Sequence, residues 1–149
     1  MNKENTKLLI NKFPELYRDY YKPMTETCMC WGFECGNGWF KHILLLSEML
    51  SSYLKQHPEL IEEFRVVQVK EKFGTLRYYV HGGDDNIERL IDLFEITSHL
   101  YCENCGTTET VKSTDGWVQY LCETCIKAKK ETNCGGHSKE KSNRKKKKS

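Results

Sequence analysis

The chain has 149 residues, which is the length of one or two compact domains. Its formal net charge is only +2, which by itself predicts no acidic or basic partner, but residues 139–148 hold seven basic side chains and one acidic side chain. Subtracting the +6 of that segment from +2 leaves the rest of the chain at −4. The sequence therefore predicts a mildly acidic body followed by a strongly basic tail.

Composition excludes membrane-spanning and secreted classes. No apolar run approaches the roughly 18 residues of a membrane-spanning helix, and the polar segment 1–7 is not followed by the apolar stretch of a signal peptide. Eight cysteines would suit a secreted disulfide scaffold, but nothing in the sequence indicates export. We therefore expect a protein of the reducing cytoplasm, in which paired cysteines bind metal more often than they form disulfides.

The first part of the chain predicts two helical segments, a loop and a long helix. A helical pattern over 3–21 contains Pro14, which we expect to divide it into a short lead and a second helix. The following residues, 22–36, are dense in cysteine and aromatic residues and predict a loop. Apolar residues recur at three- and four-residue steps over 38–56, which predicts an amphipathic helix with Asn37 as its N-cap.

Two stretches rich in β-branched and aromatic residues, 64–71 and 75–81, predict a hairpin that turns near Phe73-Gly74. A register with Glu71 opposite Leu76 would give the hairpin one apolar face. That face would consist of two cross-strand pairs, Val69 with Tyr78 and Val67 with Val80.

A third helix is expected from Asp85 and Glu88, which are three residues apart and resemble a capping box. Its apolar face would consist of Ile87, Leu90, Ile91 and Phe94, with its end near Leu100. The sequence thus predicts an α+β fold with three parts: a helix–helix–hairpin–helix body over 1–100, a zinc module over 101–133 and a disordered basic tail over 134–149.

Two Cys-x-x-Cys pairs, Cys102 with Cys105 and Cys122 with Cys125, are separated by sixteen residues. Zinc prefers four thiolates in a tetrahedron, and two such pairs supply two sulfurs each at a spacing typical of zinc sites. Because four cysteinates fill the coordination shell, we expect one structural zinc ion with no position for a substrate. A redox-active pair is the alternative, but it would require a βαβ pattern that the sequence lacks.

Between the two pairs, Asp115-Gly116 predicts the turn of a short hairpin formed by 110–113 and 117–121. The second pair leads into a helical pattern that begins near Ile126. Knuckle, hairpin and helix in this order predict a module like a treble clef or a zinc ribbon.

The remaining cysteines allow two interpretations. Cys28, Cys30 and Cys35 form a cluster, and Cys134 lies beyond the zinc module. With a fourth ligand, such as Cys134 or a histidine, the cluster could hold a second metal ion. The alternative, which the sequence favours, is that these cysteines are small apolar side chains packed beside aromatic residues.

Three features of the sequence occur together in a recognisable order. They are Gly38-Trp39 at the start of a long helix, the segment Val-Lys-Glu-Lys-Phe-Gly-Thr-Leu-Arg-Tyr over 69–78, and the two cysteine pairs with Gly116-Trp117 between them. With them the chain resembles, over residues 28–126, a family of small, largely uncharacterised proteins encoded by bacteriophages and prophages. The resemblance implies a phage protein in the bacterial cytoplasm, but no activity and no catalytic residues. The lysine-rich tail is not part of the family pattern.

The second face of the predicted hairpin is a candidate anion site. The expected register places Lys70 opposite Arg77, with Tyr79 on the same face. Like charges directly opposed are unfavourable unless an anion lies between them, and an aromatic ring beside a basic pair can stack on a base. Lys70, Arg77 and Tyr79 could therefore bind a phosphate-bearing ligand. The alternative is a solvated face on which Glu71 or Glu63 compensates the basic charge.

The basic tail is a second candidate for binding. Its charges cannot be buried, so we expect the tail to be disordered. Its consecutive basic residues are Arg144, Lys145, Lys146, Lys147 and Lys148. They would bind nucleic acid through counterion release, with little sequence preference. The alternative is a solubilising end with no ligand.

The sequence favours a binding protein over an enzyme. Five histidines are scattered along the chain, and no Ser-His-Asp or Cys-His arrangement, Walker loop or dinucleotide fingerprint occurs. We expect a phage-type accessory protein that binds zinc and associates with nucleic acid without catalysis. The alternative is an interaction protein that counters host defence, either by binding a host protein or by sequestering a nucleotide signal.

Overall fold

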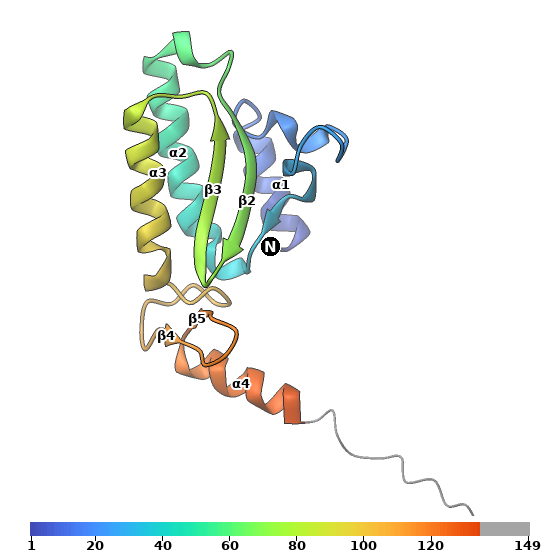
Figure 1. The fold of residues 1–149 in the computed structure, drawn as a ribbon, viewed down its shortest axis with the longest axis vertical. Coiled ribbons are helices and arrows are strands. Elements are labelled where there is room, and N and C mark those ends of the chain that lie inside the picture. The colour runs from blue at the N-terminus through green and yellow to red at the C-terminus, as the bar shows by residue number, and fades with distance from the viewer. Residues whose placement is uncertain (135–149) are drawn as a thin grey trace, which may run out of the picture.

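The computed structural model describes residues 1–134, with a mixed α+β body at one end and a smaller module, residues 101–134, at the other (Figure 1). The body contains α1 (Lys3–Lys12), β1 (Phe33–Glu34), α2 (Phe40–Gln56), β2 (Arg65–Lys72), β3 (Thr75–His81) and α3 (Asp85–Thr97). The module contains β4 (Lys112–Ser113), β5 (Tyr120–Leu121) and α4 (Glu123–Cys134). The tail expected to be disordered lies outside the described residues, apart from Cys134 at the end of α4.

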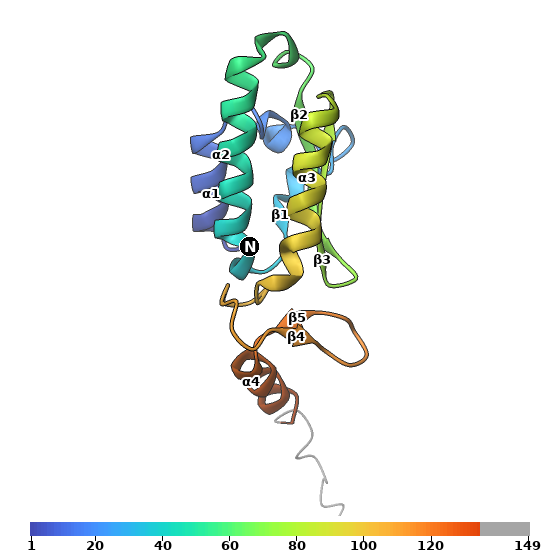
Figure 2. The ribbon, with the colours of Figure 1, turned by 90° about the vertical axis from the view of Figure 1, so that its left-hand side faces the viewer.

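The body is a three-stranded sheet packed against three helices. The strand order is β1-β2-β3, in which β2 and β3 are antiparallel and β1 runs parallel to β2. α1 contacts α2, α2 contacts α3, and α3 packs along β3, whose Tyr78 N–H donates to the Glu95 carboxylate at 2.8 Å (Figure 2). No helix of residues 1–134 combines the length and the hydropathy of a membrane-spanning segment.

The core lies between the helices and the sheet. Its largest fully buried side chains are Trp39, Tyr17, Phe64, Leu9, Leu16 and Met29. Two buried phenols also meet there, with the Tyr17 hydroxyl 2.8 Å from that of Tyr78 and 2.6 Å from the Ser47 hydroxyl. Burial raises the pKa of both tyrosines, so both stay neutral and the network remains a set of uncharged hydrogen bonds.

The prediction of a second helix within 3–21 is wrong. α1 ends at Lys12, and the chain after Pro14 forms only a 3-10 turn at Arg18–Tyr21. Proline disfavours helical backbone in the residue before it, and Phe13 accordingly leaves the helix at φ −129°. The carbonyl of Leu16 then accepts a hydrogen bond from Val66 N–H at 2.9 Å, so this backbone pairs with the sheet rather than with its own turn.

The sequence also failed to identify β1 and misplaced two caps. β1 lies within the expected loop, and its two residues are too few for a periodic pattern. Asn37 does not cap α2, because its side-chain oxygen accepts a hydrogen bond from Asn2 N–H at 2.7 Å. α3 is capped by Asp84 rather than Asp85, through a 3.0 Å bond from Ile87 N–H. Leu100 lies beyond α3 and is 50% exposed.

The hairpin register is confirmed near the turn and shifts further along the strands. Lys72 pairs with Thr75, which leaves Phe73 and Gly74 as a two-residue turn with φ of 53° and 82°. Two positive φ values are typical of the type I′ turn that matches strand twist. A bulge between Val66 and Gln68 then removes Val67 from the expected pair with Val80. Val66 takes that partner and the buried position.

Candidate metal centre

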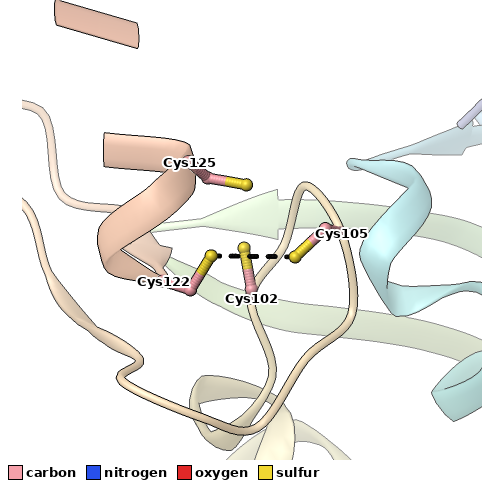
Figure 3. Close-up of side chains that lie close together, drawn as sticks. All are labelled: Cys102, Cys105, Cys122 and Cys125. Carbon is pink, nitrogen blue, oxygen red and sulfur yellow. Dashed lines mark hydrogen bonds between the residues drawn. The ribbon is translucent and has the colours of Figure 1, made fainter. Parts of the chain in front are cut away.

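Two short segments bring four sulfur atoms together at the end of the body. Cys102 and Cys105 lie in the turn that follows α3, Cys122 directly precedes α4, and Cys125 lies in the first turn of α4 (Figure 3). All four Sγ atoms lie within 4.8 Å of one another, and those of Cys105 and Cys122 are 3.7 Å apart. Sulfurs bound at about 2.3 Å to one tetrahedral ion are separated by about 3.8 Å, so the cluster has the size of a metal site.

The first knuckle depends on tight backbone turns. Gly106 N–H donates to the carbonyl of Cys102 at 2.8 Å, and Cys102 N–H donates to the carbonyl of Thr107 at 2.8 Å. Gly106 has φ of +81°, a conformation that side chains disfavour, and a Cβ there would lie 2.8 Å from the carbonyl oxygen of Gly38. Glycine is therefore required at this position both by its backbone angle and by the body packed against it.

The hydrogen bonds around Cys102 favour its thiolate form. Burial raises the pKa of Cys102, but backbone N–H groups of Cys122, Cys105 and Asn104 outweigh it and lower the pKa to about 7. The side-chain amide of Asn104 donates to Cys125 Sγ at 3.2 Å, which lowers the pKa of Cys125. Burial and the three neighbouring sulfurs act in the opposite direction and bring that pKa to about 12.

The four sulfurs also influence one another's ionisation. Four thiolates at this separation repel one another, so without a cation some of the sulfurs keep their protons. A bound divalent cation removes the repulsion and allows all four to ionise. The four cysteines thus form a site that can bind a metal ion. Four sulfur ligands complete a tetrahedral shell and leave no open position for chemistry.

The two strands of the module are shorter than the sequence predicted. β4 and β5 have two residues each, and they pair through Lys112 with Leu121 and Ser113 with Tyr120. The connecting loop covers 114–119, so Asp115-Gly116 lies within a longer loop and is not a two-residue turn. The helix expected after the second pair is present as α4.

Contacts between module and body surround the first knuckle, and the sequence analysis did not identify them. Gly38 N–H donates to the carbonyl of Glu103 at 2.7 Å, and Gly36 N–H donates to the Glu103 carboxylate at 3.1 Å. A Cβ on Gly38 would lie 2.0 Å from the carbonyl oxygen of Cys102. Glu103 is 6% exposed, and burial raises the pKa of its carboxyl group. The only sequence signal for this contact was the pair of glycines on either side of Asn37.

The other cysteines form no second cluster in the part of the chain that the structure describes. Only the group at Cys102 brings three or more ligand side chains within metal-binding distance there. Cys35 is buried in the core, and burial raises its pKa to about 12, which agrees with the packing interpretation. Cys28 is exposed, and Cys30 donates to the carbonyl of Thr27. The side chain of Cys134 lies outside the described residues.

The predicted anion site is only partly assembled. Lys70 lies opposite Arg77, as expected, and Tyr79 is on the same face. The Arg77 guanidinium, however, donates to Thr75 Oγ1 and to the carbonyl of Leu76, both at 2.9 Å. The acidic residue beside Lys70 is Glu34 of β1, and neither Glu71 nor Glu63 takes that place.

An open depression of about 830 Å³ lies on this face, but Lys70, Arg77 and Tyr79 do not line it together. Tyr79 lines it, together with Gln68 and Arg65, but Lys70 and Arg77 do not. The five basic residues from Arg144 to Lys148 lie outside the described residues.

Comparisons of the chain with models of protein families, with curated proteins and with solved structures find no match. The resemblance to phage-encoded proteins is therefore an expectation that only the quoted motifs support. The chemistry of the described residues and the charge of the tail are what indicate a function.

Proposed function

We propose that this chain is a zinc-binding protein that binds nucleic acid without catalysing a reaction. The observation that carries the proposal is the position of the four-sulfur cluster, because it anchors α4 through Cys122 and Cys125. α4 is the last described element before segment 139–148, which has seven basic residues and one acidic residue. A metal-stabilised helix therefore carries the most basic part of the chain.

The donor set supports zinc as the metal. Four thiolates in a tetrahedron are typical of structural zinc, whereas calcium and magnesium prefer oxygen ligands. A knuckle, a short hairpin and a second pair at the start of a helix follow one another in the module. This order supports a treble-clef-like module, in which zinc holds the hairpin against the helix. In the phage setting that the sequence motifs imply, such a protein would act in the bacterial cytoplasm as an accessory factor.

The basic tail supports nucleic acid as the partner. Arg144 and the four lysines after it can neutralise phosphates and release counterions without reading sequence. Lys70 and Arg77 form a second and weaker candidate contact, since Arg77 is already hydrogen-bonded within its own strand. The tail would then provide most of the salt-dependent affinity.

Deleting residues 138–149 tests this proposal. If the full chain engages about five phosphates, the logarithm of its affinity for DNA or RNA should fall with the logarithm of salt concentration at a slope of about −4 to −5. The deletion should remove most of that slope, while replacing Lys70 and Arg77 by alanine should change it by about 2 at most. A full chain that binds no nucleic acid, or a truncated chain with the same slope, would contradict the proposal.

A second candidate function is binding of a host protein. The specific observation is a row of exposed apolar side chains at three- and four-residue steps, namely Leu93 and Ile96 on α3 and Leu100 just beyond it, with exposed fractions of 55%, 66% and 50%. Apolar rows of this kind are common at protein interfaces. Replacing Leu93 and Ile96 by serine should abolish capture of such a partner and leave nucleic-acid binding intact.

A further inference from the structure

A groove of about 490 Å³ lies between the loop that joins β4 to β5 and the helix α4. Its principal lining residues are Lys112, Thr114 and Trp117 from the hairpin and Ile126, Lys129 and Lys130 from α4. We call it the Trp117 groove. Its lining combines one large aromatic ring, three lysines and several hydroxyl and amide groups, a composition unlike that of the core.

Trp117 is held at this groove by an ordered loop. Thr114 Oγ1 donates to the carbonyl of Trp117 at 2.7 Å and accepts from Gln119 N–H at 3.0 Å, while Thr114 N–H donates to the carbonyl of Gln119 at 2.8 Å. Trp117 is nevertheless 75% exposed, whereas Trp39 in the core is fully buried. The loop thus holds the backbone of Trp117 in place and leaves its large flat ring exposed to solvent, as a stacking platform requires.

The charge of the Trp117 groove is mainly positive. Lys112 pairs with Glu123 at 3.1 Å, but both side chains are more than half exposed, so a phosphate can replace this weak pair. Lys129 and Lys130 have no carboxylate at ion-pair distance within residues 1–134. Asp115 is the acidic side chain that lines the groove. The lysines therefore favour a polyanion over a neutral or cationic ligand.

We infer that the Trp117 groove binds single-stranded nucleic acid, an inference that rests on the proposed function and assigns it a site. The Trp117 ring stacks on an exposed base, and Lys112, Lys129 and Lys130 contact the phosphates on either side. Bases in a duplex are already stacked on their neighbours, so an aromatic platform selects single strands.

Binding of a fluorescein-labelled oligothymidylate to the full-length, zinc-loaded chain tests this inference, with a DNA duplex of equal length as the second probe. Trp117→Ala should weaken binding of the single strand about 5- to 150-fold, the range measured when a base-stacking aromatic residue is replaced by alanine. Trp117→Phe keeps an aromatic ring and should retain most of the affinity. Lys129→Ala combined with Lys130→Ala should reduce the salt slope by about 2.

Matched controls lie on other parts of the chain. Trp31→Ala is the control for Trp117→Ala, because Trp31 is also exposed, at 62%. Alanine at both Lys41 and Lys55, two exposed lysines of α2, is the control for the double lysine variant of α4. In a chain with Trp31→Phe, quenching of tryptophan fluorescence by oligothymidylate reports on Trp117, because Trp39 is buried. Zinc content and the thermal midpoint show that each variant is folded.

The outcomes separate this inference from the proposed function. Loss of single-strand binding in the Trp117 and lysine variants, with controls unchanged, supports it. If the full chain binds both probes and the groove variants bind like the wild type, the groove assignment is wrong and the proposed function stands. Equal losses for single strand and duplex would overturn the stacking role. A full chain that binds neither probe overturns both proposals.

Discussion

The body and the module of this protein are stabilised by different means. The body buries a continuous apolar core drawn from α1, α2, α3 and the sheet, whereas the core of the module consists of Cys102, Leu121 and Cys122. This cluster has one buried aliphatic side chain, with Val111 and Ile126 partly buried beside it, and buries too little apolar surface to offset the entropy of ordering the segment. A metal ion held by the four cysteines would supply the stability that the module's own core lacks.

The two regions nevertheless depend on each other at their contact. Gly36 and Gly38 of the body donate backbone hydrogen bonds to Glu103, which directly follows Cys102, the first cysteine of the cluster. The ring of Tyr120 on β5 lies against His99 and beside the hairpin turn at Gly74. Disorder of the module should therefore expose the end of the body, and distortion of the body should disturb the first knuckle.

Of the changes considered, metal removal should produce the largest difference in stability between the module and the body. Structural zinc contributes roughly 10–16 kcal/mol of apparent binding energy in isolated zinc-finger peptides, and the small core of the module cannot replace it. We expect chelation, or Cys102→Ser combined with Cys122→Ser, to unfold the module and leave the body folded. Hydrogen exchange measured by mass spectrometry should show loss of protection over 101–134 and retained protection in α2 and β2.

A substitution in the body provides the converse control. Leu46→Ala creates a cavity in the core and should lower the free energy of unfolding by about 2–5 kcal/mol while the metal content remains one ion per chain. If chelation destabilised the body as much as the module, the division of stability between metal and core would be wrong.

Gly38→Ala should have the next largest effect, because it acts on the contact between the two regions. The added methyl group would lie 2.0 Å from the carbonyl oxygen of Cys102 and 2.5 Å from that of Glu103, so backbone must move. We expect a loss of about 3 kcal/mol in the free energy of unfolding and a lower affinity for zinc. Denaturant unfolding and competition with a zinc chelator measure the two effects.

Gly116→Ala is the matched control for Gly38→Ala. Gly116 has φ of +75°, but a Cβ there would meet no atom within 4 Å. Only backbone strain of about 1 kcal/mol is expected, with unchanged zinc affinity. Equal effects of the two substitutions would show that the contact at Gly38 does not couple the regions.

The smallest expected effect is a pH dependence in the body alone. His42 is buried beside Phe94 and Tyr101 and donates from Nε2 to the carbonyl of Phe94 at 2.7 Å. Burial lowers the pKa of His42 below its ordinary value of 6.5, although the bond to the Phe94 carbonyl raises it in part. Neutral His42 therefore contributes stability above pH 6.5, and this stability is lost as the pH falls through the lowered value.

His42→Gln isolates this contribution, because glutamine keeps a donor for the Phe94 carbonyl and carries no charge. Between pH 7.5 and pH 5.5 the wild type should lose more free energy of unfolding than the variant. Protonation of the metal ligands affects both proteins alike, so the difference between their pH profiles reports on His42. Parallel profiles would exclude the histidine as the source.

Local patterns in the sequence predicted the elements that depend on neighbouring residues. The apolar spacing of α2, the β-branched strands around Phe73-Gly74 and the amphipathic pattern of α3 were sufficient to predict those elements. Errors occurred where a distant contact overrides local preference. Leu16 pairs with Val66, Asn37 accepts from Asn2, and β1 exists only because β2 lies beside it. None of these partners is near in the sequence.

The candidate metal centre shows the same contrast between local sequence patterns and distant contacts. The two Cys-x-x-Cys pairs determined by themselves which residues can hold a metal ion, since their spacing encodes two knuckles with two sulfurs each. Only the tertiary structure decided that Gly36 and Gly38 pack against the first knuckle and that Trp117 lines a groove with the lysines of α4. Ligand spacing is a local property of the chain, whereas packing and grooves arise from segments that meet only after folding.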